Sequence, residues 1–139
     1  MPKYLHNPRD PDPAYREFWR ERRLCTLTTL RADGSPHVVP VGATYDPAQA
    51  TARVIASGTS AKVRHVLAAT GAGERARVAV CQFEGRRWAT LEGYATIRTE
   101  PELIADGERR YEERYGRPPR PNARRVLIEI AVTAALGTR

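Results

Sequence analysis

The sequence has little that would cross-link it or place it in a membrane. It holds only two cysteines, Cys25 and Cys81, each within an apolar run, so we expect neither a disulfide framework nor a cysteine metal cluster. No apolar run approaches the roughly 20 residues that a membrane span needs, and the first residues lack the apolar segment of a secretory signal. These absences predict a reduced, cytoplasmic protein without a membrane anchor.

Acidic residues are scarce relative to arginine. Lysine and arginine total 23 against 16 aspartates and glutamates, which gives a net charge of +7, and only Lys3 and Lys62 are lysines. A basic surface favours an anionic partner, such as a nucleic acid, a membrane headgroup, or a phosphorylated or polycarboxylate ligand. No nucleic-acid recognition motif accompanies the charge, so we expect a small anionic ligand and neither nucleic acid nor membrane as partner.

Length and periodicity predict a mainly β domain. The 139 residues suit one domain, which we place at 13–139 after an N-terminal arm at 1–12. Apolar residues at helical spacing predict three helices, at 13–23, from Ser60 to Gly71 and from Thr99 to Tyr115. Apolar runs bounded by turn residues predict six strands, at 24–30, 36–45, 52–57, 76–83, 87–98 and 125–132. Short connections favour antiparallel neighbours, and we expect the sheet to close into a small barrel with short flanking helices.

The most specific local signal lies between a predicted strand and a predicted helix. It runs from Ser57 through Gly58, Thr59 and Ser60 to Lys62. A helix N-terminus presents unpaired N–H groups, glycine lets the backbone approach closely, and the hydroxyls and the lysine add donors and charge, so the segment can cradle a phosphate. The alternative is an ordinary helix start, with Thr59 or Ser60 as N-cap and Lys62 in solvent. The residues alone leave both interpretations open.

Side chains suited to acid–base catalysis are few. The three histidines, His6, His37 and His65, have no further metal ligand at suitable spacing, and we expect His6 to be solvated. His37 lies next to a predicted hairpin, where it is either a proton donor or an exposed edge residue. No nucleophile elbow or zinc-binding helix motif is present. We therefore assign no catalytic residue, expect no metal, and expect a bound cofactor to carry the chemistry.

Arginines crowd the last third of the chain. Arg117, Arg120, Arg124 and Arg125 lie in a proline-rich connector at 117–125 that contains no acidic residue. On the preceding predicted helix, acidic residues are interleaved with arginines and can pair with them. The connector has no acidic residue of its own, so it is a candidate docking surface for an anionic tail.

Three segments, TTLRADGSPHVV, RWATLEG and RPNARRVLIEI, together with the order of the predicted elements, carry a family resemblance. The chain resembles the split-barrel family of flavin- and deazaflavin-binding proteins, whose fold is that of the pyridoxamine-phosphate oxidases. It is most similar to the branch that uses the deazaflavin coenzyme F420, and there to F420-dependent biliverdin reductases. The resemblance implies a six-stranded antiparallel split β-barrel and a homodimer, with two cofactor sites that are each built from both chains.

The resemblance also implies roles for particular residues. The segment from Ser57 to Lys62 matches the phosphate-binding loop of the family, with Ser60 and Lys62 at its strongest positions. Other contacts are implied for a strand beside the ring system, for a ring-adjacent residue, and for a connector that approaches from the partner chain. These positions are Pro36, His37, Val38 and Val39 on the strand, Trp88 beside the ring, and Arg120 and Asn122 in the connector.

The second predicted strand departs from the pyridoxamine-phosphate oxidases, which carry an arginine and then a lysine there. This chain has neither between His37 and Gly42, and Ala61 stands where those enzymes have an arginine in the phosphate loop. Both differences favour F420, whose phosphate and oligoglutamate tail suit a basic surface, over FMN. We therefore expect an F420H2-dependent reductase that transfers a hydride to an unsaturated acceptor such as biliverdin. The alternatives are an FMN-dependent oxidase or reductase and a non-catalytic protein that binds flavin, deazaflavin or haem.

Overall fold

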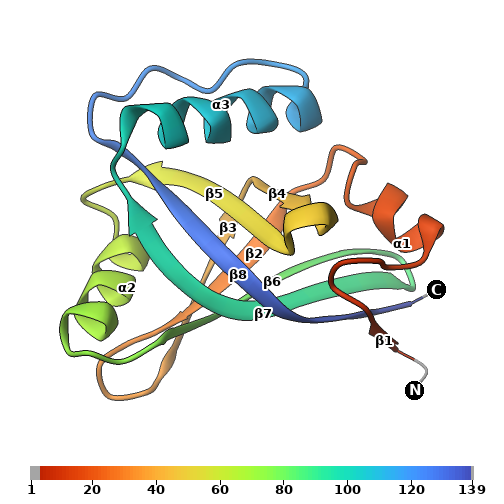
Figure 1. Cartoon of the computed structure of the whole chain (residues 1–139), viewed down its shortest axis with the longest axis horizontal. Helices are drawn as coiled ribbons and strands as arrows, with labels where there is room; N and C mark the ends of the chain where they lie inside the picture. The colour runs from red at the N-terminus through yellow and green to blue at the C-terminus, as the bar shows by residue number, and fades with distance from the viewer. Residues whose placement is uncertain (1–3, 139) are drawn as a thin grey trace.

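The computed structural model describes residues 4–138, which form a curled antiparallel sheet with helices around it (Figure 1). The helices are α1 (Pro13–Phe18), α2 (Ala61–Gly71) and α3 (Pro101–Tyr115), with a 3-10 turn at Pro47–Gln49. The strands are β1 (Leu5–His6), β2 (Cys25–Leu30), β3 (Pro36–Val41), β4 (Ala43–Asp46), β5 (Thr51–Ser57), β6 (Ala76–Glu84), β7 (Arg87–Arg98) and β8 (Arg125–Gly137). No helix in this described part is long and apolar enough to cross a membrane.

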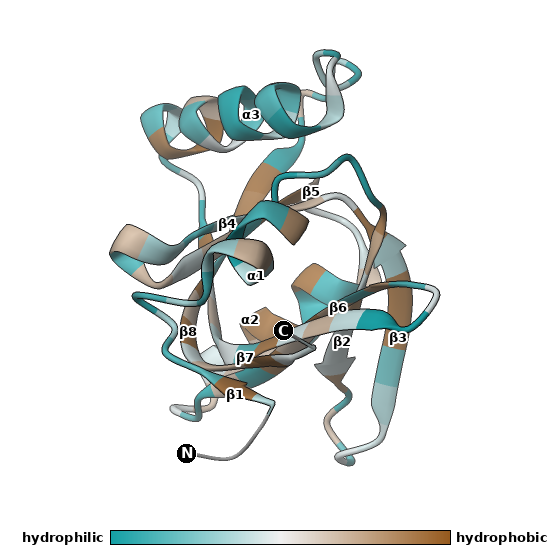
Figure 2. Cartoon of the chain, turned by 90° about the vertical axis from the view of Figure 1, so that its right-hand side faces the viewer, coloured by the Kyte–Doolittle hydropathy of each residue, from teal (hydrophilic) through white to brown (hydrophobic). Residues whose placement is uncertain are grey.

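The sheet curls because a single residue joins its two edges. The strand order is β3-β2-β6-β7-β8-β5-β4, so β3 and β4 lie at opposite edges although only Gly42 separates them along the chain. A flat sheet of this order would hold these edges far apart, so the strands wrap around a common interior (Figure 2). Within residues 4–138, β3 and β4 do not pair with each other, and the barrel therefore stays split between them.

The prediction of six strands is wrong, because the sheet has eight. The run 36–45 breaks at Gly42 into β3 and β4, where a Cβ atom would lie 2.7 Å from Cε2 of Tyr111. The predicted arm contains the short strand β1, in which Leu5 pairs with Leu136 of β8. The remaining strands match their predicted ranges to within a residue, except that β8 continues to Gly137.

Two of the three predicted helices are confirmed at their predicted ends, and the first is shorter than predicted. α1 ends at Phe18 instead of residue 23. The carbonyl oxygens of Glu21 and Arg23 accept hydrogen bonds from Nε of Arg114, at 2.9 Å, and from the hydroxyl of Tyr115, at 2.8 Å. These bonds to α3 hold the link between α1 and β2 in an irregular path, which helical periodicity alone cannot reveal.

Alternate side chains of the strands fill the interior, as is typical of strands with one face on a core. α2 adds Val63 and Val66 to this core, and α1 adds Tyr15. The expectation that His6 is solvated is wrong, because its side chain is only 3% exposed. Pairing of β1 with β8 places the His6 ring 4.1 Å from the Tyr15 ring and its Nε2 3.1 Å from the carbonyl oxygen of Gly137.

Arg114 is buried near the end of α3 and pairs with no carboxylate of the described chain. Arg114 is 8% exposed, and its Nε donates to the carbonyl oxygen of Glu21. Its Nη1 donates to the carbonyl oxygen of Ala43 at 2.6 Å, and its Nη2 donates to Oε1 of Gln82. The guanidinium also lies 5.4 Å from the ring centre of Trp19. These contacts tie α3 to the α1–β2 link, to β4 and to β6.

Replacing Arg114 with Met would keep an apolar stem but remove a donor from three acceptors, of which those on Ala43 and Gln82 are buried. An unsatisfied buried acceptor costs about 1–3 kcal/mol, so we expect Arg114→Met to lower the free energy of unfolding by about 3 kcal/mol. Urea denaturation followed by far-UV circular dichroism measures this change. The matched control is Arg117→Met, an exposed position where about 0.5 kcal/mol or less is expected. Equal stabilities of the two variants would contradict the role given to Arg114.

Candidate functional site

The segment between β5 and α2 packs against the start of β8. Ser57, at the end of β5, lies opposite Arg125 in the sheet, and the N–H of Gly58 donates to the carbonyl oxygen of Arg124 at 2.7 Å. A Cβ atom at Gly58 would lie 3.0 Å from that oxygen, so the close approach favours glycine. The bond places the N-terminus of α2 beside the arginine-rich connector.

The first turn of α2 has no side-chain cap. Ser60 occupies the N-cap position, but its hydroxyl donates to the carbonyl oxygen of Ser57 at 2.8 Å and accepts nothing from the helix. The hydroxyl of Thr59 contacts Oγ of Ser57 at 3.1 Å, and the first turn contains no acidic residue. Ser60 therefore occupies the N-cap position that the alternative of an ordinary helix start expects, but its side chain makes no capping hydrogen bond. The first N–H groups of α2 remain available to an anion.

Lys62 lies in this uncapped turn and is half-buried. It makes no hydrogen bond or ion pair with any residue in the described range 4–138. Burial lowers the pKa of its ammonium group, because removal from water penalises the charged form. A cation at the positive end of a helix is also unfavourable by itself. Both costs would be offset by an anion bound at the same turn, so Lys62 is suited to a phosphate.

Arg64 is a second cation at this turn, and the sequence analysis missed it. Its Nη1 donates to the carbonyl oxygen of Thr59 at 2.7 Å, which folds the guanidinium back toward the loop. It pairs with no carboxylate of the described chain, and its other N–H groups can reach a ligand. The available signal was a second basic residue two positions after Lys62, which by itself is typical of any solvated helix.

Strand β3, which was predicted to lie beside the ring system of the cofactor, has one face toward α2 and one face away from it. His37 is opposite the buried Thr29, so it points toward α2, and Val39 shares that side. Pro36 and Val38 point away from α2 and are exposed. The structure therefore brings His37 and Val39 toward the helix that carries Lys62, whereas Pro36 and Val38 can contribute only backbone there.

His37 and His65 meet between β3 and α2. Their ring centres are 4.9 Å apart, and Nδ1 of His65 lies 2.8 Å from Oγ1 of Thr29. Burial lowers the pKa of His65, and the nearby His37, Arg31 and Arg64 lower it further. His65 is consequently neutral at pH 7 and held in orientation by a buried hydroxyl. One turn of α2 separates this imidazole from Lys62.

Trp88 does not join this cluster within one chain. It lies opposite Phe83 near the start of β7, and its backbone N–H donates to Oγ1 of Thr138 at 3.2 Å. Ser57, in contrast, is level with Arg125 at the start of β8. The two places lie at opposite ends of β8, whose 13 residues span up to roughly 40 Å along the strand.

The connector lies beside the loop of its own chain, because Arg124 accepts the hydrogen bond from Gly58. Nη2 of Arg125 donates to the carbonyl oxygen of Arg120 at 2.6 Å, and Oδ1 of Asn122 accepts from the N–H of Arg124 at 2.9 Å. Because Arg124 also holds Gly58, this turn brings Arg120 and Asn122 into the neighbourhood of the uncapped helix. The Asn122 side chain is engaged in its own turn.

The fold is a split antiparallel barrel, and a basic loop between β5 and α2 leads into the uncapped start of that helix. These two features define a class of cofactor-binding domains. The chain belongs to the pyridoxamine 5'-phosphate oxidase family, whose sequence pattern matches residues 11–139. It is 46% identical over 121 residues to the F420H(2)-dependent biliverdin reductase of Mycobacterium tuberculosis (strain CDC 1551 / Oshkosh). That match covers 87% of this chain and 83% of the relative.

Solved structures share the fold. An F420 reductase, 22% identical, superposes with a TM-score of 0.69 over 91% of this chain and 98% of its own. A conserved hypothetical protein of Mycobacterium tuberculosis, 20% identical, superposes with a TM-score of 0.75 over 99% of this chain and 88% of its own. These similarities confirm the predicted split-barrel architecture.

Proposed function

We propose that the protein is an F420H2-dependent reductase that reduces an unsaturated tetrapyrrole of the biliverdin type. The observation that carries the proposal is the half-buried, unpaired Lys62 at the uncapped start of α2. The similarity to an F420H(2)-dependent biliverdin reductase over 87% of this chain supports the same choice of cofactor and acceptor.

The cradle formed by residues 57–62 fits the phosphate of the cofactor. The first N–H groups of α2 are uncapped there, Lys62 lies in the same turn, and Arg64 adds a second positive charge. His37 and Val39 present a side of β3 toward the same helix, where a planar ring can lie. When bound, the reduced deazaflavin supplies a hydride, and the protein supplies position and charge complementarity.

The connector favours F420 over FMN. Arg120 and Arg124 are exposed beside the cradle and pair with no carboxylate of the described chain. The oligoglutamate tail of F420 offers several carboxylates to such a surface, and FMN offers only its phosphate. The absence of an arginine and lysine between His37 and Gly42 supports the same choice.

Lys62→Ala should weaken F420 binding at least tenfold. A hydrogen bond to a charged group is worth about 1.5–3 kcal/mol, and 1.4 kcal/mol corresponds to a factor of about ten in affinity. Fluorescence titration of F420 measures the dissociation constant, and the melting temperature without ligand should hardly change. Arg86→Ala, in the exposed turn between β6 and β7, is the matched control. Equal F420 affinities of Lys62→Ala and Arg86→Ala would refute the cradle.

F420 should bind more tightly than FMN at low salt, and the preference should shrink as salt rises. Each exposed charge pair contributes only about 0.2–1 kcal/mol and is screened beyond about 8 Å at physiological salt. Isothermal titration at several salt concentrations checks this expectation. A truncated F420 without the glutamate tail should lose most of the salt dependence and keep the ring and phosphate contacts. FMN binding as tight as F420 binding at low salt would favour the FMN-dependent alternative.

We infer that the protein is a homodimer joined through the outer face of β2, β3, β6 and β7. Phe83, Val38 and Leu30 are 68%, 57% and 41% exposed there, although they are apolar. The register shows that Phe83 shares this face with Trp88, and Val38 with Thr28. Soluble proteins rarely leave such a patch open, and the sparse charge on it suits a second copy. The predicted alternating face of β7 belongs to this patch, with Trp88, Thr90, Glu92 and Tyr94.

A dimer also resolves the position of Trp88, because Trp88 of the partner subunit can complete a site that is remote from Trp88 of the same chain. Light scattering should give a mass twice that of the chain at micromolar concentration. Phe83→Glu places a charge on the outer face and should produce monomers. Leu67→Glu, at an exposed position on α2 that is 50% accessible, should leave the dimer intact. A monomeric unmodified protein would contradict the shared cofactor site.

A further inference from the structure

The arginines of the protein are unevenly paired. Nine of them form ion pairs with carboxylates, mostly around α1, α3 and the β6–β7 turn. Arg31, Arg75 and Arg77 have no carboxylate partner within residues 4–138, although all three border one cleft. A shared cleft with unpaired guanidinium groups points to an anionic ligand, because guanidinium matches carboxylate geometry well.

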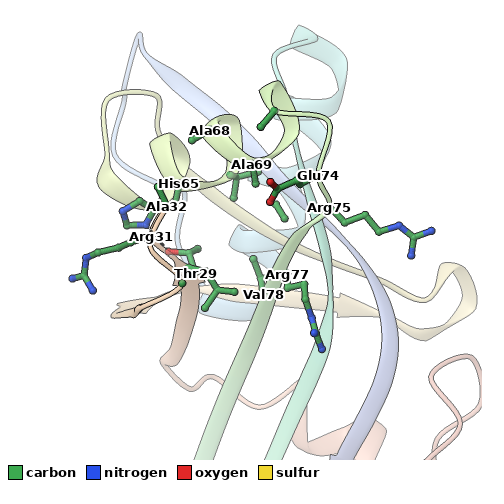
Figure 3. A pocket seen from close by; sticks show the side chains of 15 residues that line it. Thr29, Arg31, Ala32, His65, Ala68, Ala69, Glu74, Arg75, Arg77 and Val78 are labelled. Carbon is green, nitrogen blue, oxygen red and sulfur yellow. Dashed lines mark hydrogen bonds between the residues drawn. The ribbon is translucent and has the colours of Figure 1, made fainter.

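This cleft lies between α2, the end of β2 and the start of β6, and encloses about 240 Å³. Its lining includes small apolar side chains, among them Ala68 and Ala69 of α2 and Val78 of β6. Figure 3 shows the guanidinium groups of Arg31 and Arg75 on opposite sides, both directed outward from the rim, with Glu74 between them. The cleft therefore suits an apolar body whose acidic groups extend to the rim.

The rim arginines are held in ways that leave donors free. Nη1 of Arg31 donates to the carbonyl oxygen of Pro36 at 2.7 Å, which fixes one edge of its guanidinium. The Arg75 guanidinium lies 4.8 Å from the ring centre of Tyr94, and stacking on a ring leaves the in-plane N–H groups accessible. Arg77 is exposed on β6, directly opposite Tyr94 in the sheet. Arg75 and Arg77 thus flank the same tyrosine.

The cleft adjoins the cofactor cradle through α2. His65 lines the cleft and contacts His37 of β3, the strand that faces the same helix. Lys62 lies three residues before His65, and residues three apart are neighbours on one helix face. His65 therefore places one end of the cleft a helical turn from Lys62, and Arg75 and Arg77 lie beyond the other end of α2.

We propose that this cleft binds the carboxylate-bearing part of the acceptor, which is an apolar conjugated acid with two carboxylates. The propionate groups of a linear tetrapyrrole have this chemistry. The volume of about 240 Å³ is below that of a pocket for a whole drug-sized ligand, so the cleft takes one portion of the acceptor and leaves the rest toward β3. The assignment rests on the proposed function for the identity of the acceptor.

The test compares biliverdin with its dimethyl ester, bound to the full-length protein with and without oxidised F420 and followed by absorbance. The double variant Arg75→Gln/Arg77→Gln should bind biliverdin about fivefold or more weakly, the scale of two exposed charge pairs, and should bind the ester like the unmodified protein. Glu74→Gln should tighten biliverdin binding, because it removes the carboxylate between the rim arginines. Arg22→Gln/Arg86→Gln, at two exposed positions outside the cleft, is the control of equal charge change and should alter the binding of neither ligand.

Unchanged biliverdin affinity in the double variant, equal losses for acid and ester, or no biliverdin binding by the unmodified protein would each overturn the assignment. The melting temperature of each variant verifies folding. Light scattering verifies that the double variant keeps the oligomeric state of the unmodified protein, because Arg77 shares the outer face of β6 and β7 with Tyr94. The proposed function fails separately. If the unmodified protein binds biliverdin in a way that depends on Arg75 and Arg77 but does not bind F420, the proposed reductase function is wrong and the assignment of the cleft is kept. If F420H2 reduces biliverdin with an unchanged KM in the double variant, the cleft assignment falls alone.

Discussion

The two edge strands of the sheet are consecutive in the chain, and this covalent constraint underlies the rest of the structure. Gly42 is the only residue between β3 and β4, so the sheet has to curl until its edges meet. The aromatic side chains of α3 then approach this residue so closely that a Cβ atom would lie 2.7 Å from Tyr111. Arg114 and Tyr115 hold the same region through bonds to the backbone of Ala43.

The curl also decides where the candidate site lies. It places β5 beside β8, so the loop after β5 meets the connector that precedes β8. The bond between Gly58 and Arg124 fixes this meeting, and the uncapped start of α2 follows directly. A helix N-terminus, a half-buried lysine and an arginine are therefore gathered at one point by sheet topology. Together these groups make up the anion site of the proposed function.

The net charge of +7 indicates where a ligand could bind only when the positions of the unpaired arginines are known. Many arginines are neutralised by carboxylates on their own helix or across the sheet, as in the pairing of Arg110 with Asp106 and of Arg98 with Glu129. The unpaired ones concentrate around α2 and in the connector. Exposed charges without partners cost little in water, so they can be retained for a ligand that carries several negative charges. This pattern suits both an anionic cofactor and an anionic acceptor.

The sequence by itself determined the period and order of the elements, because alternation along a strand or a helical stripe depends on residues a few positions apart. The range of β7, the ends of α2 and α3 and the loop from Ser57 to Lys62 could all be predicted in this way. The sequence also carried the family resemblance, since its motifs are local.

Tertiary structure alone decided the break at Gly42, the early end of α1, the burial of His6 and the separation of Trp88 from the cradle. It also decided that Ser60 leaves the helix uncapped and that Lys62 is half-buried. The break at Gly42, the early end of α1 and the burial of His6 depend on partners far away in the chain, namely Tyr111, Arg114 and β8. Their positions follow from how the sheet curls, which no local pattern encodes.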